Sequence, residues 1–120
     1  DEISDENVVL AIAENYYEAR IRVEPEKAMK YRNVIFKFTG LDVLEVDILD
    51  EALWKDFIKK IKSSMKLKPE TLIRRFEAKA LELQTSLDEG LTAKLAKQTK
   101  ADLELINNRI EDLKGIKRGI

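Results

Sequence analysis

The stretch that best indicates the fold of this chain is Lys30-Tyr31-Arg32-Asn33-Val34-Ile35-Phe36-Lys37-Phe38-Thr39-Gly40-Leu41. Read as a helix, this stretch places Tyr31, Ile35 and Phe38 on one side. The opposite flank and its edges carry cations and an amide, which we call the basic ledge: Lys30, Arg32, Asn33 and Lys37. Such an apolar side predicts a buried helix. Burial would hold the basic ledge in place, as an anion-binding site requires.

Residues that typically begin or end helices occur before this stretch and at its end. A first helix is expected to begin near Ser4 or Asp5, where a side-chain oxygen can cap it. Pro25 is expected to begin the second helix, because a missing N–H costs nothing at a first helical position, and Gly40 is expected to end it. Between the two, residues 19–24 read either as extended chain or as a frayed helix end.

The remaining chain continues this helical pattern. Residues 41–50 are acidic and read as a linker with one or two anchoring side chains, in preference to a short strand. Asp50 can cap a third helix. From Pro69 onward, apolar residues step by three and four on both sides of Gly90, which is the rhythm of paired helices. Two long helices folded back at Gly90 are therefore predicted.

Together these signals predict an all-α protein: a helical bundle of about five helices with a C-terminal antiparallel helical hairpin. A length of 120 residues predicts a single domain, residues 1–120. Within it, residues 1–65 would form a three-helix part with the basic ledge, and residues 69–114 the hairpin. Residues 115–120 read as the exit to a neighbouring domain.

Composition excludes several kinds of chemistry. The chain has no cysteine and no histidine, so it offers no thiolate zinc site, no cysteine nucleophile and no imidazole base. Carboxylate-only chemistry stays open, but no metal site is predicted, since acids such as Asp42, Glu45 and Asp47 read as linker charges. Charged residues make up 38% with a net charge of -1, which is typical of thermophile proteins and predicts a cytoplasmic protein. No apolar run approaches a membrane span, so no membrane partner is predicted.

Segregated charge points to the candidate binding residues. Residues 20–37 contain six basic and two acidic residues, and residues 55–79 contain nine basic and three acidic ones. Within the second range, Lys55, Lys59, Lys62 and Lys66 share one side of the third expected helix, which makes this lysine face the second candidate binding surface. The candidates for contacts with phosphates, sugars or bases are Arg20, Arg22, Lys27, Lys30, Tyr31, Arg32, Asn33, Lys37, Lys62, Lys66, Arg74 and Arg75. Tyr17 and Tyr31 are candidates for base stacking, whereas Trp54 reads either as a stacking platform or as part of the packing rim. The alternative is that these charges form a solvated face and these rings belong to the core.

Two segments also carry a resemblance to a known family. Arg32-Asn33 followed by Phe36-Lys37-Phe38-Thr39-Gly40-Leu41, together with Ile3-Ser4-Asp5-Glu6 and Tyr16-Tyr17, resembles the helical domain that follows the catalytic core of plasmid- and phage-type archaeal primase-polymerases. The resemblance covers about residues 3–65. It implies an accessory module without chemistry of its own that helps to hold template DNA and nucleotides beside a catalytic primase domain in the same chain. Family members often carry a histidine beside the arginine, and that residue's role has no counterpart here.

The leading hypothesis is therefore a non-catalytic module that binds single-stranded DNA template and nucleoside triphosphates and assists primer initiation by a DNA replication primase. No intrinsic cofactor is expected, and the ligand would be ATP or another nucleoside triphosphate with Mg²⁺. Because the four glycines lie far apart, no glycine-rich phosphate loop exists, and a nucleotide site must be built from side chains and helix termini. The alternative is a protein–protein adaptor, or an oligomerising structural protein, that uses the C-terminal hairpin.

Overall fold

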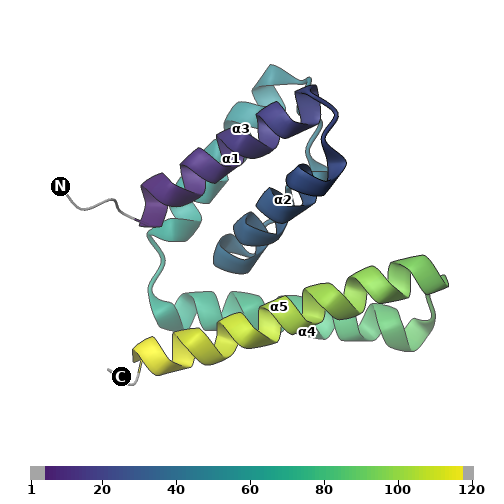
Figure 1. Cartoon of the computed structure of the whole chain (residues 1–120). Coiled ribbons are helices and arrows are strands. Elements are labelled where there is room, and N and C mark those ends of the chain that lie inside the picture. The colour runs from purple at the N-terminus through teal and green to yellow at the C-terminus, as the bar shows by residue number, and fades with distance from the viewer. Residues whose placement is uncertain (1–4, 118–120) are drawn as a thin grey trace. The chain divides into compact units, whose positions relative to one another are not determined.

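The computed structural model describes residues 5–117 as helices joined by short connections (Figure 1). In order these are α1 (Asp5–Ile21), α2 (Pro25–Thr39), a 3₁₀ turn η1 (Val43–Glu45), α3 (Glu51–Met65), α4 (Pro69–Glu89) and α5 (Ala93–Lys117). The described residues contain no strand, so the prediction of an all-α fold with about five helices is confirmed. The chain is divided into two compact units, one that reaches to Leu67 and another that begins at Lys68.

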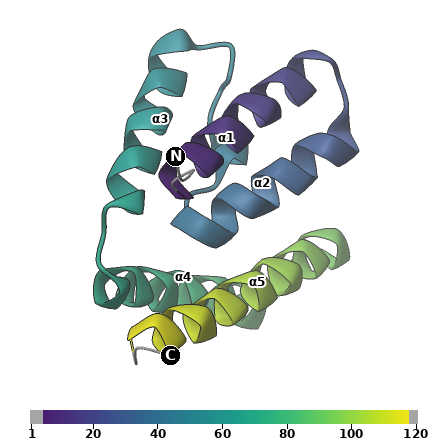
Figure 2. The same cartoon turned by 60° about the vertical axis from the view of Figure 1, so that its left-hand side comes forward.

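The first unit has α1 and α2 packed side by side with α3 completing the bundle (Figure 2). Its core contains Val9, Ala13 and Tyr16, which recur at helical spacing on α1, and these meet apolar residues of the other elements. The other core members are Ala19, Ala28, Ile35, Val43, Ile48, Phe57 and Ile61. Each helix thus buries one apolar stripe, and Tyr16 is a core residue rather than an exposed ring.

Local capping rules explain where the elements of this unit begin and end. Pro25 is the first residue of α2, and Gly40 ends that helix in the left-handed conformation at φ 74°, with its amide donating to the Phe36 carbonyl. The Asp50 side chain caps α3 by accepting from the Leu53 amide. All three boundaries agree with the sequence prediction. Helix α1 runs to Ile21, so the first part of residues 19–24 is helical.

The acidic segment before α3 is a linker with two anchors, as predicted. Val43 and Ile48 are buried, and they hold the segment against the core. Only the short turn η1 interrupts it. In this segment the Asp42 and Asp47 side chains each accept a hydrogen bond from a backbone amide, that of Leu44 and that of Leu49.

The second unit is the predicted antiparallel hairpin. Helices α4 and α5 pack against each other and reverse direction through residues 90–92 (Figure 1). Gly90 sits at φ 97°, a conformation that glycine adopts without a Cβ penalty. Ile73 and Phe76 on α4 and Ile106 and Ile110 on α5 are buried, in keeping with the three-and-four spacing of the sequence.

Candidate nucleic-acid interface

Arg32, the central residue of the predicted basic ledge, makes a bidentate ion pair with Asp42. Its Nε donates to Asp42 Oδ1 at 3.0 Å and its Nη2 to Oδ2 at 2.9 Å. The Arg32 side chain is 1% exposed and that of Asp42 is 19% exposed. The carboxylate therefore occupies the position that a phosphate would need in order to bind this guanidinium.

The other contacts of Arg32 also belong to the fold. Its Nη1 donates to Asn33 Oδ1 at 3.1 Å, and its guanidinium carbon lies 4.4 Å from the centre of the Phe36 ring. Asp42 in turn accepts from the Leu44 amide at 3.0 Å. Arg32 consequently ties α2 to the turn η1, and the predicted role of Arg32 as a phosphate clamp is replaced by a structural one.

Helix geometry explains why the basic ledge does not form one surface. Arg32 lies two residues from Lys30, which is about 200° around an α-helix, so the two side chains leave opposite sides of α2. Lys30 and Lys37 are seven residues apart and lie within about 20° of each other. They share one side of α2, and neither makes an ion pair with a side chain that the structure describes.

A second group of predicted residues meets at the junction of α1 and α2. Arg22, Lys27 and Tyr31 line a small polar hollow of about 80 Å³, together with Glu18 and Glu24. Lys27 Nζ lies 2.9 Å from Glu24, and Arg22 lies 3.9 Å from Glu18. The hydrogen bond from Lys27 lowers the pKa of Glu24, and the same bond raises the pKa of Lys27. Two cations thus face two carboxylates, and the charges of the hollow balance.

Arg20 points elsewhere. Its Nη1 donates to the Tyr16 hydroxyl at 2.6 Å, and its guanidinium carbon lies 5.7 Å from the centre of the Tyr16 ring. This contact within α1 gives the buried tyrosine hydroxyl a partner. Arg20 and Arg22 are both exposed, but they do not line the same hollow.

The predicted stacking residues pack against each other across α1 and α3. The rings of Tyr17 and Trp54 are 5.3 Å apart and tilted, and those of Trp54 and Phe57 are 5.8 Å apart and stacked. Tyr17 and Trp54 are only half-buried. Of the two interpretations of Trp54, the contacts favour the packing rim.

Helix α3 and its C-cap residue carry a regular cationic surface, which we call the α3 lysine row: Lys55, Lys59, Lys62 and the C-cap Lys66. Steps of four, three and four keep these residues within about 60° of arc and spread them over about 16 Å of helix. Lys55 lies 3.2 Å from Glu51, whereas Lys59, Lys62 and Lys66 make no ion pair within residues 5–117. Lys60 lies off the row and pairs with Asp56 at 3.4 Å. The sequence predicts this row as the lysine face of the third helix, with Lys62 and Lys66 among the candidate binding residues.

The remaining predicted cations belong to the hairpin. Arg74 and Arg75 are exposed on α4, in the second unit. The α3 lysine row, in contrast, belongs to the first unit. The candidate residues therefore fall on several surfaces.

Two further features of the described residues bear on function. No three aspartate or glutamate side chains in residues 5–117 are grouped so that they could hold a metal ion. None of the helices in this part of the chain combines the length and the apolar character needed to cross a membrane.

Comparison with protein-family models, with curated proteins and with solved structures found no match for this chain. The resemblance to the helical domain of primase-polymerases therefore stays a prediction from the residues quoted above.

Proposed function

We propose that this chain is a non-catalytic helical module that binds single-stranded DNA template and nucleoside triphosphates and assists primer initiation by a DNA replication primase. The observation that supports the proposal is the α3 lysine row, in which three ammonium groups without acidic partners among the described residues lie along one helix. Lysine suits this task because it meets phosphates as a point charge and needs no fixed fork geometry. A strand would run along α3 with its phosphates beside Lys59, Lys62 and Lys66.

The triphosphate would bind over the hollow at the junction of α1 and α2 rather than inside it, because about 80 Å³ is too small to enclose a nucleotide. Arg22 and Lys27 would contact its phosphates and Tyr31 its base or ribose. The Arg22–Glu18 pair is well exposed, and exposed ion pairs contribute only about 0–1 kcal/mol, so a triphosphate with Mg²⁺ can displace the carboxylate at little cost. The module would contribute by position, because holding template and nucleotide together lowers the entropic part of the initiation barrier.

Fluorescence anisotropy with a labelled oligothymidylate, at two salt concentrations and with and without ATP, tests the proposal. Replacing Lys59, Lys62 and Lys66 by Gln should weaken binding at least about tenfold at low salt. The slope of the plot of log affinity against log salt concentration should become shallower by about 2. Each phosphate contact on a single strand contributes about 0.7 to this slope, and the variant loses three contacts.

A matched control carries the same change of charge on α5. Lys94, Lys97 and Lys100 are spaced by threes, which spreads them over about 120° of arc, so they form no row. Replacing these three residues by Gln should leave both affinity and salt dependence close to wild type. Equal losses in the two triple variants would show that binding depends on total charge alone, and the proposal would then be rejected.

The second candidate function is an adaptor or an oligomerising protein that uses the hairpin. An open hollow of about 600 Å³ lies between α4 and α5, with Ala80, Leu81, Leu103 and Ile110 among its lining residues. Leu81 is 69% exposed, which leaves apolar surface for another helix. Sedimentation that shows dimers at micromolar protein, abolished by Leu81→Lys, combined with no binding of oligothymidylate, would favour this function.

A further inference from the structure

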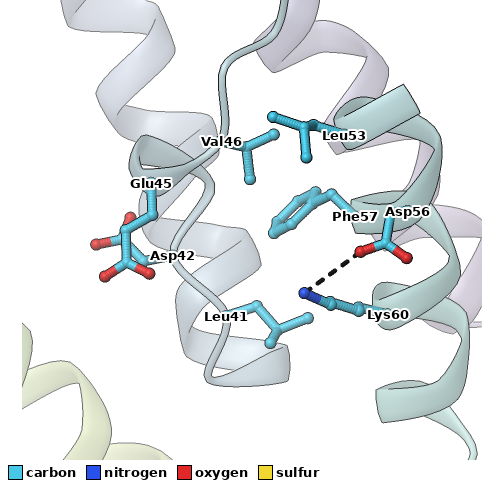
Figure 3. A pocket seen from close by; sticks show the side chains of 8 residues that line it. All are labelled: Leu41, Asp42, Glu45, Val46, Leu53, Asp56, Phe57 and Lys60. Carbon is cyan, nitrogen blue, oxygen red and sulfur yellow. Dashed lines mark ion pairs between the residues drawn. The ribbon is translucent and has the colours of Figure 1, made fainter. Parts of the chain in front are cut away.

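The first unit contains a groove, between the linker and α3, that the proposed function does not use (Figure 3). It encloses about 220 Å³. Apolar side chains of Val46, Leu53, Phe57 and Leu41 face one another across it, with the Asp56–Lys60 ion pair on the α3 side and acids on the linker side. The groove thus has an apolar interior and a charged rim.

Two of its apolar residues, Leu41 and Val46, belong to a linker whose backbone is held by side-chain hydrogen bonds. Three aspartates each accept a hydrogen bond from the amide of a leucine that follows: Asp42 from Leu44, Asp47 from Leu49 and Asp50 from Leu53, at 3.0, 3.0 and 3.2 Å. The three leucines are nevertheless 44%, 78% and 49% exposed, and Leu53 is the one of them that lines the groove. The segment therefore holds large apolar side chains in water on a backbone that is already ordered, which lowers the entropic cost of binding a partner.

The rim is acidic. The charged side chains that line the groove are three carboxylates and one lysine: Asp42, which pairs with Arg32, Glu45, and Asp56, which pairs with Lys60. Glu45 lines the groove, is exposed, and has no ion pair with any side chain that the structure describes. A partner with lysine or arginine beside its apolar anchor would complement this charge, whereas an acidic partner would be repelled.

Size argues for a protein segment rather than a small ligand. Small-molecule sites usually enclose about 300–1,000 Å³, so this groove holds one or two side chains instead. We propose that the groove of Leu41, Val46, Leu53 and Phe57 binds a short basic segment of a partner protein, with a leucine or a similar side chain inserted between Leu53 and Val46. A single buried anchor surrounded by polar contacts is the usual source of affinity in such interfaces.

This site is distinct from the α3 lysine row. Leu53 precedes Lys55 by two residues, so it leaves the opposite side of the helix, about 200° away. The basic segment and an oligonucleotide can therefore bind at the same time. The inference does not depend on the proposed function, and the two can fail separately.

Anisotropy of a short fluorescein-labelled peptide tests the inference. The probe carries two leucines at helical spacing between lysines, and a second probe has both leucines replaced by serine. The leucine probe should bind at micromolar concentration, and the serine probe about tenfold or more weakly. Equal binding of the two probes, or no binding of the leucine probe, would overturn the inference, since the first outcome would indicate charge attraction alone.

Two pairs of variants locate the site. Leu53→Asn should weaken binding of the leucine probe about tenfold, whereas Leu81→Asn, on an exposed helical leucine of the other unit, should not. Glu45→Gln should weaken binding about threefold at low salt, and Glu14→Gln, on an exposed carboxylate of α1, should leave it unchanged. If Leu53→Asn binds the probe like wild type, the groove is not the site. Oligothymidylate binding measured on the same Leu53→Asn variant should be unaffected, which separates this test from that of the proposed function.

Discussion

The Arg32–Asp42 pair offers the sharpest test of how this fold is held together, through the substitutions Asp42→Asn and Arg32→Met and the double variant. Asp42→Asn removes the bidentate carboxylate from a guanidinium that is 1% exposed. Removing one partner of such a pair usually costs about 3–5 kcal/mol of unfolding free energy. Arg32→Met should cost less, about 2–3 kcal/mol, because the remaining carboxylate is 19% exposed and still accepts from the Leu44 amide.

The double variant distinguishes a coupled pair from two independent residues. The double variant lacks both charges, so its loss of unfolding free energy should be smaller than the sum of the losses in the two single variants. The difference should be at least about 2 kcal/mol. Asp56→Asn serves as the control, since its pair with Lys60 is well exposed at 3.4 Å, and it should cost less than about 1 kcal/mol.

Urea unfolding followed by the fluorescence of Trp54 is a suitable assay. Trp54 is the only tryptophan of the chain and packs between Tyr17 and Phe57, so its signal reports the unit that contains the ion pair. If Asp42→Asn cost less than about 1 kcal/mol, or if the single losses simply added, Arg32 would not be the structural residue that its contacts indicate. The predicted phosphate-binding role would then deserve renewed testing by oligonucleotide binding.

Other predictions concern single residues of the first unit. Val23 has φ 55°, a backbone conformation that a β-branched residue rarely adopts. Val23→Gly should therefore increase the unfolding free energy by about 1 kcal/mol, which thermal melts would show as a higher midpoint. Gly40→Ala, at φ 74°, should lower unfolding free energy by about 1 kcal/mol in the same melts. Thr39→Val should cost about 1–2 kcal/mol in urea unfolding, because the buried hydroxyl donates to the Ile35 carbonyl at 2.7 Å. The pKa of the Glu24 carboxyl, measured by NMR, should lie below the ordinary value of 4.5 and should return toward 4.5 in the Lys27→Gln variant. Because folding lowers this pKa, the carboxylate stabilises the fold above the ordinary carboxyl pKa. This stabilisation is lost as the pH falls through the pKa of the folded state.

Much of the fold could be predicted because its boundaries obey local rules. Proline at a first helical position, glycine at a left-handed C-terminus and aspartate at an N-cap act within four residues, so Pro25, Gly40 and Asp50 could be read directly from the sequence. The hairpin followed from apolar spacing and one turn at Gly90 in the same way. None of these inferences required knowledge of distant contacts.

The candidate site was harder to predict because its charges are paired over longer distances. Arg32 and Asp42 lie ten residues apart, and only the turn of the chain at Gly40 and η1 brings them together. The sequence showed both charges but not their pairing, so the arginine was assigned to a ligand and the aspartate to a solvated linker. Helical spacing alone could have separated Lys30 from Arg32, just as it identified the lysine face of the third helix.

The two proposed surfaces also show how a slightly acidic chain can bind a polyanion. At physiological salt, charges interact over about 8 Å, whereas a helix with its side chains is about 10–12 Å wide. The carboxylates that line the groove, such as Glu45, lie with Leu53 on the side of α3 away from the lysine row, so helix thickness and salt together screen them from a strand bound along the row, whereas Glu51 pairs with Lys55 of the row at 3.2 Å. At low salt the screening length grows and the acids reach the strand, which should partly offset the stronger attraction of the lysines. Replacing Glu45 by Gln should therefore strengthen oligothymidylate binding at low salt and leave it unchanged at physiological salt, the reverse of its effect on the basic peptide.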